Sequence, residues 1–239
     1  MKILSIGNSF SQDAQRYLHR LAKKEGDLLK TVNLYIGGCS LRTHYLNCVD
    51  DEAKYLFEFN GENTGLYVSI KQVLNSDEWD IVTLQQASPL SGKFETYSPY
   101  LEYLAEYVKK RCPQAKIYIH QTWAYEDGCD ILKNTAGYKT AQEMFDAISS
   151  SYEKAAKLIN ADGFIPSGKA MFNATKMGIE KIHRDTYHAS LGAGRYLLAL
   201  TWYKTLTGKD ITNNSFNEFD EPVMQEEREI VIKAVNSAF

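Results

Sequence analysis

Three features that would point to a particular class of protein are missing from this chain of 239 residues. No run of about 18 apolar residues occurs, so we expect no membrane-spanning segment. The four cysteines form no CxxC pair, so neither a zinc site nor a disulfide framework is expected. A net charge of -3 gives no excess of the kind that marks a nucleic-acid or anionic-membrane partner.

The composition that remains is that of an ordinary globular protein, with 44% hydrophobic and 24% charged residues. The length fits one domain over residues 1–239. The stretch Met1–Gly7 is too short for the apolar region of a signal peptide, so we expect a cytoplasmic protein, or a secreted one whose leader has been removed. Aromatic residues reach 12%, and the 16 tyrosines suit sugar-like ligands as well as an amphipathic core edge.

Short apolar segments alternate along the chain with segments of helical periodicity. The expected strands are residues 3–6, 32–36, 79–84, 117–119 and 164–166, and the expected helices are residues 14–21, 70–74, 100–111, 144–159, 191–206 and a terminal helix from Pro222. This alternation predicts an α/β fold, a three-layer α/β/α sandwich around a parallel five-stranded sheet. Two further β segments flank Asn60-Gly61, which predicts a small β-hairpin insertion over residues 54–70.

Ligands of such folds bind beyond the carboxyl ends of the strands, so the turns at those ends are the candidates for chemistry. Ser9 follows the first strand where a helix begins and N–H groups are unpaired, so it is either a nucleophile that also supplies an oxyanion donor or a helix cap. Gly38 follows the second strand and offers a second N–H donor, or simply a tight turn. Cys39 is a rival nucleophile, but no base stands beside it in the sequence.

Two amides and two aromatic residues follow the next two strands. Gln85 and Gln86 come directly after an apolar strand, and a buried amide needs a partner. Because successive strand residues face opposite ways, one of the two should reach the site as an oxyanion donor, and we favour Gln86 over Gln85; bonding to the neighbouring loop is the alternative. Trp123 and Tyr125 either wall a substrate pocket or pack beneath a loop.

The last candidate is Asp185-x-x-His188, before the long helix near the C-terminus. A spacing of three puts both side chains on one face of a helical turn, where a carboxylate would orient an imidazole that acts as a base. Three alternatives compete: a metal site that includes His183, a chance likeness of His183-Arg184-Asp185 to a kinase loop, and a helix cap beside a surface histidine. No HExxH segment supports the first and no GxGxxG loop supports the second.

Taken together, these turns resemble the sequence blocks of the SGNH/GDSL hydrolase superfamily. Gly7-Asn8-Ser9 is similar to the first block, Gly38 to the second and Asp185-x-x-His188 to the last. The segments GNSFS, IGGCSL, LQQ, QTWAY and DxxHxSxxGxY resemble a poorly characterised bacterial branch, and together they bracket residues 7–196. The third block departs from the pattern, since the amides above stand where the family has GxND. The resemblance implies a flavodoxin-like sandwich and hydrolysis of acyl lipids, acetylated sugars or thioesters.

The resulting hypothesis is a serine esterase that removes a small acyl group, most simply acetyl, from a carbohydrate-like or other polar alcohol through an acyl-enzyme. A small-molecule ester is then its only expected partner, with no nucleic acid, membrane, metal or cofactor. The alternatives are a non-catalytic carbohydrate-binding descendant and a nucleotide binder, although no Walker-type lysine supports the latter. The predicted site residues are Ser9, Asp185 and His188 for catalysis, Ser9, Gly38 and Gln86 (or Gln85) for the oxyanion, and Trp123 and Tyr125 for the substrate.

Overall fold

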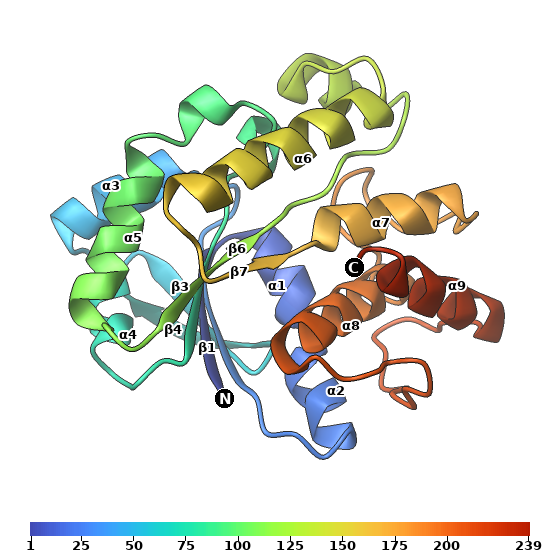
Figure 1. The fold of residues 1–239 in the computed structure, drawn as a ribbon, viewed down its shortest axis with the longest axis horizontal. Helices are drawn as coiled ribbons and strands as arrows, with labels where there is room; N and C mark the ends of the chain where they lie inside the picture. The colour runs from blue at the N-terminus through green and yellow to red at the C-terminus, as the bar shows by residue number, and fades with distance from the viewer.

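The computed structural model describes all 239 residues and centres on one seven-stranded sheet with the order β4-β3-β2-β1-β5-β6-β7. Helices cover both faces of this sheet (Figure 1). The α/β sandwich predicted from the sequence is therefore confirmed. The strands are β1 (Lys2–Gly7), β2 (Lys30–Tyr35), β3 (Tyr55–Phe59), β4 (Glu62–Val68), β5 (Ile81–Leu84), β6 (Lys116–His120) and β7 (Gly163–Ile165).

The prediction of a five-stranded sheet with a separate hairpin is corrected in one respect. Strands β2, β1, β5, β6 and β7 are parallel as expected, but β3 pairs antiparallel with β2 and β4 pairs with β3, so the hairpin extends the sheet. Without the hairpin, β2 would be an edge strand with a row of unpaired N–H and C=O groups. Pairing across Leu34↔Phe57 and its neighbours satisfies those groups.

Nine α-helices form the two outer layers: α1 (Ser9–Gln15), α2 (Leu18–Lys24), α3 (Leu41–Asp50), α4 (Ile70–Leu74), α5 (Tyr100–Arg111), α6 (Ala141–Leu158), α7 (Ser167–Lys176), α8 (Ala193–Thr207) and α9 (Gln225–Asn236). In Figure 1, α3, α5 and α6 lie on one side of the sheet and α1, α2 and α8 on the other, where α7 and α9 pack against α8. No helix combines the length and the apolar character needed to cross a bilayer.

The sequence did not predict α3 and α7 because polar or small residues occupy their buried faces. In α3 the buried positions include His44 and Asn47, whose side chains bond to the Tyr55 hydroxyl, so the apolar periodicity is interrupted. In α7 they include Ser167 and Gly168. A buried polar group with a partner packs as well as an apolar one, but it does not show in a hydrophobic pattern.

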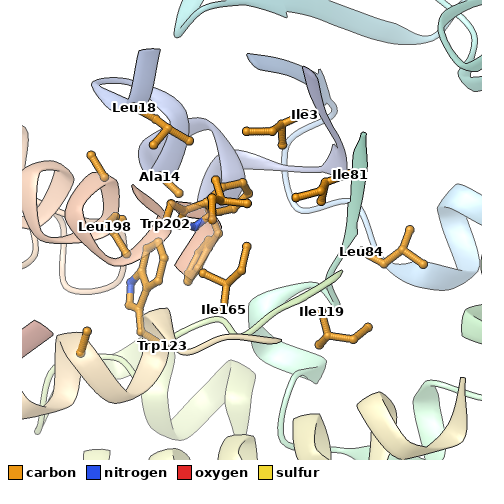
Figure 2. Close-up of a cluster of buried hydrophobic side chains, with 14 of the residues drawn as sticks. Ile3, Ala14, Leu18, Ile81, Leu84, Ile119, Trp123, Ile165, Leu198 and Trp202 are labelled. Atoms are coloured by element: carbon orange, nitrogen blue, oxygen red, sulfur yellow. The ribbon is translucent and has the colours of Figure 1, made fainter. Parts of the chain in front are cut away.

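Large side chains fill the space between the sheet and the α1–α2–α8 layer. Figure 2 shows Leu18 of α2 and Leu198 and Trp202 of α8 converging toward Ile3 of β1 and Ile81 of β5. All five are buried. This packing fixes the sheet against the layer that begins with Ser9, so the nucleophile candidate stands on a rigid support.

The parallel strands end at a common edge of the sheet, and that edge carries the candidate residues. At the end of β1, Gly7 lies so close to α1 that a Cβ atom would stand 2.0 Å from the Ser11 Oγ atom. Only glycine fits there. The close approach turns the chain sharply from strand to helix and leaves Ser9 as the first helical residue.

Candidate active site

The structure brings Ser9, His188 and Asp185 into one chain of hydrogen bonds. The Ser9 Oγ atom lies 2.8 Å from His188 Nε2, although the two residues are 179 positions apart. On the other side of the ring, His188 Nδ1 lies 2.7 Å from Asp185 Oδ2. The second carboxylate oxygen of Asp185 accepts a bond from the His188 backbone N–H at 2.8 Å. With Nδ1–H donated to the carboxylate, Nε2 is free to accept the serine proton.

Two aromatic rings lie next to the imidazole of His188. The ring centroid of Tyr187 lies 4.0 Å from that of the imidazole, and the ring centroid of Phe10 lies 5.9 Å from it.

The two side chains of this hydrogen-bonded pair differ in exposure, since His188 is 15% exposed and Asp185 is 45% exposed. Partial burial alone would raise the pKa of Asp185, but the hydrogen bonds from His188 outweigh it and lower that pKa. The carboxylate is therefore charged near neutral pH and can stabilise a protonated imidazole.

Contacts from other elements hold the loop that carries Asp185 and His188. The Trp123 indole N–H donates to the Tyr187 carbonyl at 2.8 Å, and its ring stacks on Phe10 at 4.1 Å. The guanidinium of Arg184 binds the carboxylate of Asp13, which lies on α1, at 2.9 and 3.0 Å. Since Ser9 begins the same helix, this ion pair links the nucleophile to the loop of the base.

Two backbone N–H groups are available beside Ser9. Ser9 is the first residue of α1, so its N–H has no partner within the helix. Gly38 lies at the exposed turn after β2 with φ of 63°, and its N–H bonds to nothing in the protein. Asn8 joins the two turns, because its side-chain amide donates to the Cys39 carbonyl at 3.1 Å. Ser9 and Gly38 line the same pocket, so two N–H groups without a protein partner border it.

The structure does not bring the amide of Gln86 to this site. Its oxygen accepts from the backbone N–H groups of Leu41 and Ala87, and its nitrogen donates to the Thr96 carbonyl and hydroxyl. Gln86 therefore bonds to the neighbouring loops, the alternative left open by the sequence, and it is fully buried.

Gln85 faces the other way, as the strand alternation predicted. It donates to Asn8 Oδ1 at 2.7 Å and its oxygen lies 2.6 Å from His120 Nδ1. Gln85 therefore fixes the side chain of Asn8 by a hydrogen bond and does not itself line the pocket. Ser88 and Pro89, which follow in the same segment, do line the pocket, and the Ser88 hydroxyl lies 2.7 Å from that of Tyr125.

A pocket of about 420 Å³ opens at Ser9 and His188. Tyr125 lines it as predicted, whereas Trp123 is fully buried behind Phe10 and acts as a support. Most of the side chains in the wall are polar or aromatic. The lining residues are Asn8, Ser9, Phe10, Gln12, Tyr35, Gly37, Gly38, Ser88, Pro89, Tyr125, Ile131, Thr135, Arg184, Tyr187 and His188.

The structure also bears on the rival readings of the sequence. Cys39 is buried, which raises the pKa of its thiol to about 12, and the adjacent His44 imidazole has its pKa lowered to about 3 by burial. Neither group ionises near neutral pH, so this pair is not an activated nucleophile. His183 forms no hydrogen bond with Asp185, and its Nε2 atom lies 3.1 Å from the Ala124 carbonyl oxygen. No cluster of three potential metal ligands occurs anywhere in the chain.

Sequence reasoning missed several pocket residues, of which Tyr35, Gln12 and Arg184 are examples. Tyr35 is the last residue of β2, three positions before Gly38, so a search of all strand ends would have found it. Arg184 stood inside the His-Arg-Asp triplet that was set aside as a chance likeness.

The family described as "Domain of unknown function (DUF4886)" matches residues 2–238. A DUF4886 family protein from Bacteroides uniformis is 35% identical, with a TM-score of 0.91 over 100% of this chain and 94% of its own. No curated protein matches the chain.

Two more distant structures share the fold. A protein from Slackia heliotrinireducens assigned to the SGNH hydrolases is 23% identical, with a TM-score of 0.62 over 86% of this chain and 98% of its own. The acetylxylan esterase Axe2 from Geobacillus stearothermophilus is 16% identical, with a TM-score of 0.54 over 86% of this chain and 94% of its own. The fold is that of the SGNH/GDSL hydrolases, as the sequence blocks indicated.

Proposed function

The chain belongs to the DUF4886 family, and we propose that it is a serine hydrolase that cleaves small acyl esters. One observation carries the proposal: an unbroken hydrogen-bonded series from Asp185 through His188 to Ser9, at the mouth of a pocket. A nucleophile, a base and a group that orients the base are the parts that acyl transfer requires.

In the proposed first step, the Ser9 Oγ atom attacks the acyl carbon while His188 Nε2 takes its proton. The bond to the alcohol then breaks, and the imidazolium returns the proton to the leaving alkoxide. A water molecule repeats the sequence and releases the acid from Ser9. Asp185 holds the ring in the required tautomer and stabilises its charged form.

The negative charge that develops on the acyl oxygen faces the N–H groups of Ser9 and Gly38. Each such donor contributes about 2.7–4 kcal/mol to lowering the barrier. Because Gln86 is engaged elsewhere, we propose that the hole consists of these backbone groups, with Ser88 in the loop after β5 also lining the pocket.

The pocket supports a polar alcohol as the leaving group. Its wall contains the hydroxyl-bearing residues Tyr35, Tyr125, Thr135 and Tyr187, and few of its side chains are purely apolar, whereas the binding of an extended acyl chain would require many. Tyrosine rings stack on sugar faces while their hydroxyl groups form hydrogen bonds. We therefore propose a small acyl group, most simply acetyl, on a carbohydrate-like alcohol, which is also the kind of ester named for Axe2.

The test is turnover of p-nitrophenyl acetate, butyrate and octanoate, together with an acetylated xyloside, using Ser9→Ala as the background. We expect acetate to be cleaved at least about tenfold faster than octanoate, since each misplaced methylene costs roughly 1–3 kcal/mol. Faster cleavage of octanoate would overturn the small-acyl assignment. Sugar binding with no turnover of any ester would instead indicate a non-catalytic carbohydrate-binding protein.

A further inference from the structure

The wall of the candidate pocket is unbalanced in charge. Among its 15 residues, Arg184 is the only lysine or arginine, and no aspartate or glutamate is present. The chain as a whole is slightly acidic, with a net charge of -3. A single arginine in an otherwise uncharged cleft therefore differs from the rest of the surface, and it is not explained by the hydrolysis of a neutral ester.

Only one edge of the Arg184 guanidinium is occupied. Its Nη1 atom donates to both carboxylate oxygens of Asp13 and to the Ala189 carbonyl. Its Nε and Nη2 atoms have no partner in the protein, and neither is sealed from solvent. The side chain is 26% exposed, whereas Asp13 is fully buried. The buried carboxylate thus fixes the guanidinium and leaves its other edge open.

The carboxylates around this pocket are already paired and cannot fill the open edge. Asp13 is shared between Arg184 and Arg195. Glu58 accepts from Gln12 and from Asn33. Asp185 binds His188 on the far side of the imidazole. The open donors are therefore available to a ligand that enters the pocket.

We propose that Arg184 forms an anion subsite, and that the alcohol part of the natural ester carries a carboxylate, as in an acylated sugar acid. A carboxylate suits the site because two parallel donors on one guanidinium edge match its two oxygens. This inference rests on the proposed ester hydrolysis at Ser9, since the subsite lies in the same pocket as the triad.

The rival explanation is that Arg184 only clamps α1 to the loop of His188. The clamp uses Nη1 alone, and Arg195 supplies a matched comparison. Arg195 also binds Asp13, at 2.9 Å, but it does not line the pocket. A purely structural arginine and a substrate-binding one can therefore be separated with the same substitution at the two positions.

The experiment measures kcat/KM for O-acetylated methyl glucuronide and O-acetylated methyl glucoside, which share a ring and differ in the carboxylate. We expect the wild type to prefer the glucuronide about ten- to hundredfold, the range of a charge-assisted hydrogen bond. Arg184→Met should bring this ratio close to one, and Arg184→Lys should retain part of it. Arg195→Met should keep the ratio, whatever it does to overall activity.

Equal rates on the two esters by the wild type, or a preference that survives Arg184→Met, would overturn the subsite and leave the esterase in place. Absence of turnover on both esters, together with no labelling of Ser9 by a fluorophosphonate, would instead overturn the proposed function.

If Arg184→Met does not fold, inhibition of the wild type decides the matter. Methyl glucuronide should inhibit p-nitrophenyl acetate hydrolysis at lower concentration than methyl glucoside, and the difference should shrink as NaCl rises from about 0.05 to about 0.5 M. Equal inhibition at both salt concentrations would contradict the proposal.

Discussion

Two serine–histidine contacts occur in this molecule, and they are almost identical in length. Ser9 Oγ lies 2.8 Å from His188 Nε2, and Ser167 Oγ lies 3.0 Å from His120 Nε2. In both cases the other ring nitrogen meets a side-chain oxygen, of Asp185 in the first pair and of Gln85 in the second. Distance alone would therefore nominate both as catalytic.

The surroundings distinguish the Ser9–His188 pair, which lines the pocket, from the Ser167–His120 pair, which is the buried pair. Asp185 carries a charge that stabilises an imidazolium, whereas the amide of Gln85 does not. His120 and Ser167 are fully buried, and burial lowers the pKa of His120 to about 3. His188 lines a pocket that two N–H groups without a protein partner also border, and neither Ser167 nor His120 lines it. A serine beside a histidine becomes a nucleophile only where a carboxylate, solvent access and oxyanion donors are also present.

The strongest contrast should come from removing each hydroxyl. Ser9→Ala should lower kcat on p-nitrophenyl acetate by at least about 10⁴-fold, because the triad acts as a unit. Ser167→Ala should leave most of the activity and lower the free energy of unfolding by about 1–3 kcal/mol, since His120 loses a buried partner. Initial rates and urea titrations of both variants check this. If Ser167→Ala were the inactive variant, the assignment of the two pairs would be reversed.

The oxyanion donors can be examined through Gly38, which lines the pocket next to Ser9 and His188. Gly38 and Gly65 both have positive φ values, of 63° and 74°, and a Cβ atom would meet nothing within 4 Å at either. An alanine strains both backbones by roughly 1–2 kcal/mol. Gly38→Ala should lower kcat about ten- to hundredfold as its N–H shifts, because a lost donor costs at most about 10²–10³.

Gly65 lies in the exposed strand β4, far along the sheet from β1, so Gly65→Ala should cost stability but not kcat. Equal kcat values for the two variants would show that the Gly38 N–H takes no part.

The smallest effect concerns the acid stability contributed by the buried pair. The unfolded chain takes up a proton on His120 near pH 6.5, whereas the folded protein resists it down to about pH 3. The buried neutral His120 therefore leaves the free energy of unfolding unaffected above about pH 6.5. As the pH drops through this window, the free energy of unfolding falls, by up to about 2 kcal/mol between pH 7 and pH 5. In His120→Gln the loss over this range should be smaller by that amount, as measured by urea unfolding at the two pH values. An unchanged loss would mean that His120 titrates normally.

The sequence was sufficient where local pattern decides the structure. The parallel strands and the turns that carry Ser9 and Gly38 follow from apolar periodicity and strand-end position. The helical turn expected for Asp185-x-x-His188 is wrong: the two residues meet in a loop closed by the His183–Ala189 bridge, where Thr186 has a positive φ of 74°. The sequence was insufficient where distant partners decide. The direction of Gln86 depends on Thr96 and on the N–H of Leu41, which belong to other loops.

The same limit explains the other differences. Trp123 looked like a pocket wall because aromatic residues in loops often are, yet Phe10 lies between it and the pocket. The hairpin pairs with the edge of β2 that would otherwise lack hydrogen-bond partners. The sequence of residues 54–70 shows that a hairpin forms but does not indicate which strand it pairs with. Arg184 appeared as a loop residue, and only Asp13, from the opposite end of the chain, shows how its guanidinium is held.

Labelling with a fluorophosphonate, followed by peptide mass spectrometry, tests the comparison most directly. The reagent reacts only with a serine activated by a base, and it needs access from solvent. We expect one label per chain, on Ser9, and none in His188→Ala. A label on Ser167 or on any other residue, or no label on a protein that still hydrolyses esters, would contradict the assignment of Ser9 as the nucleophile.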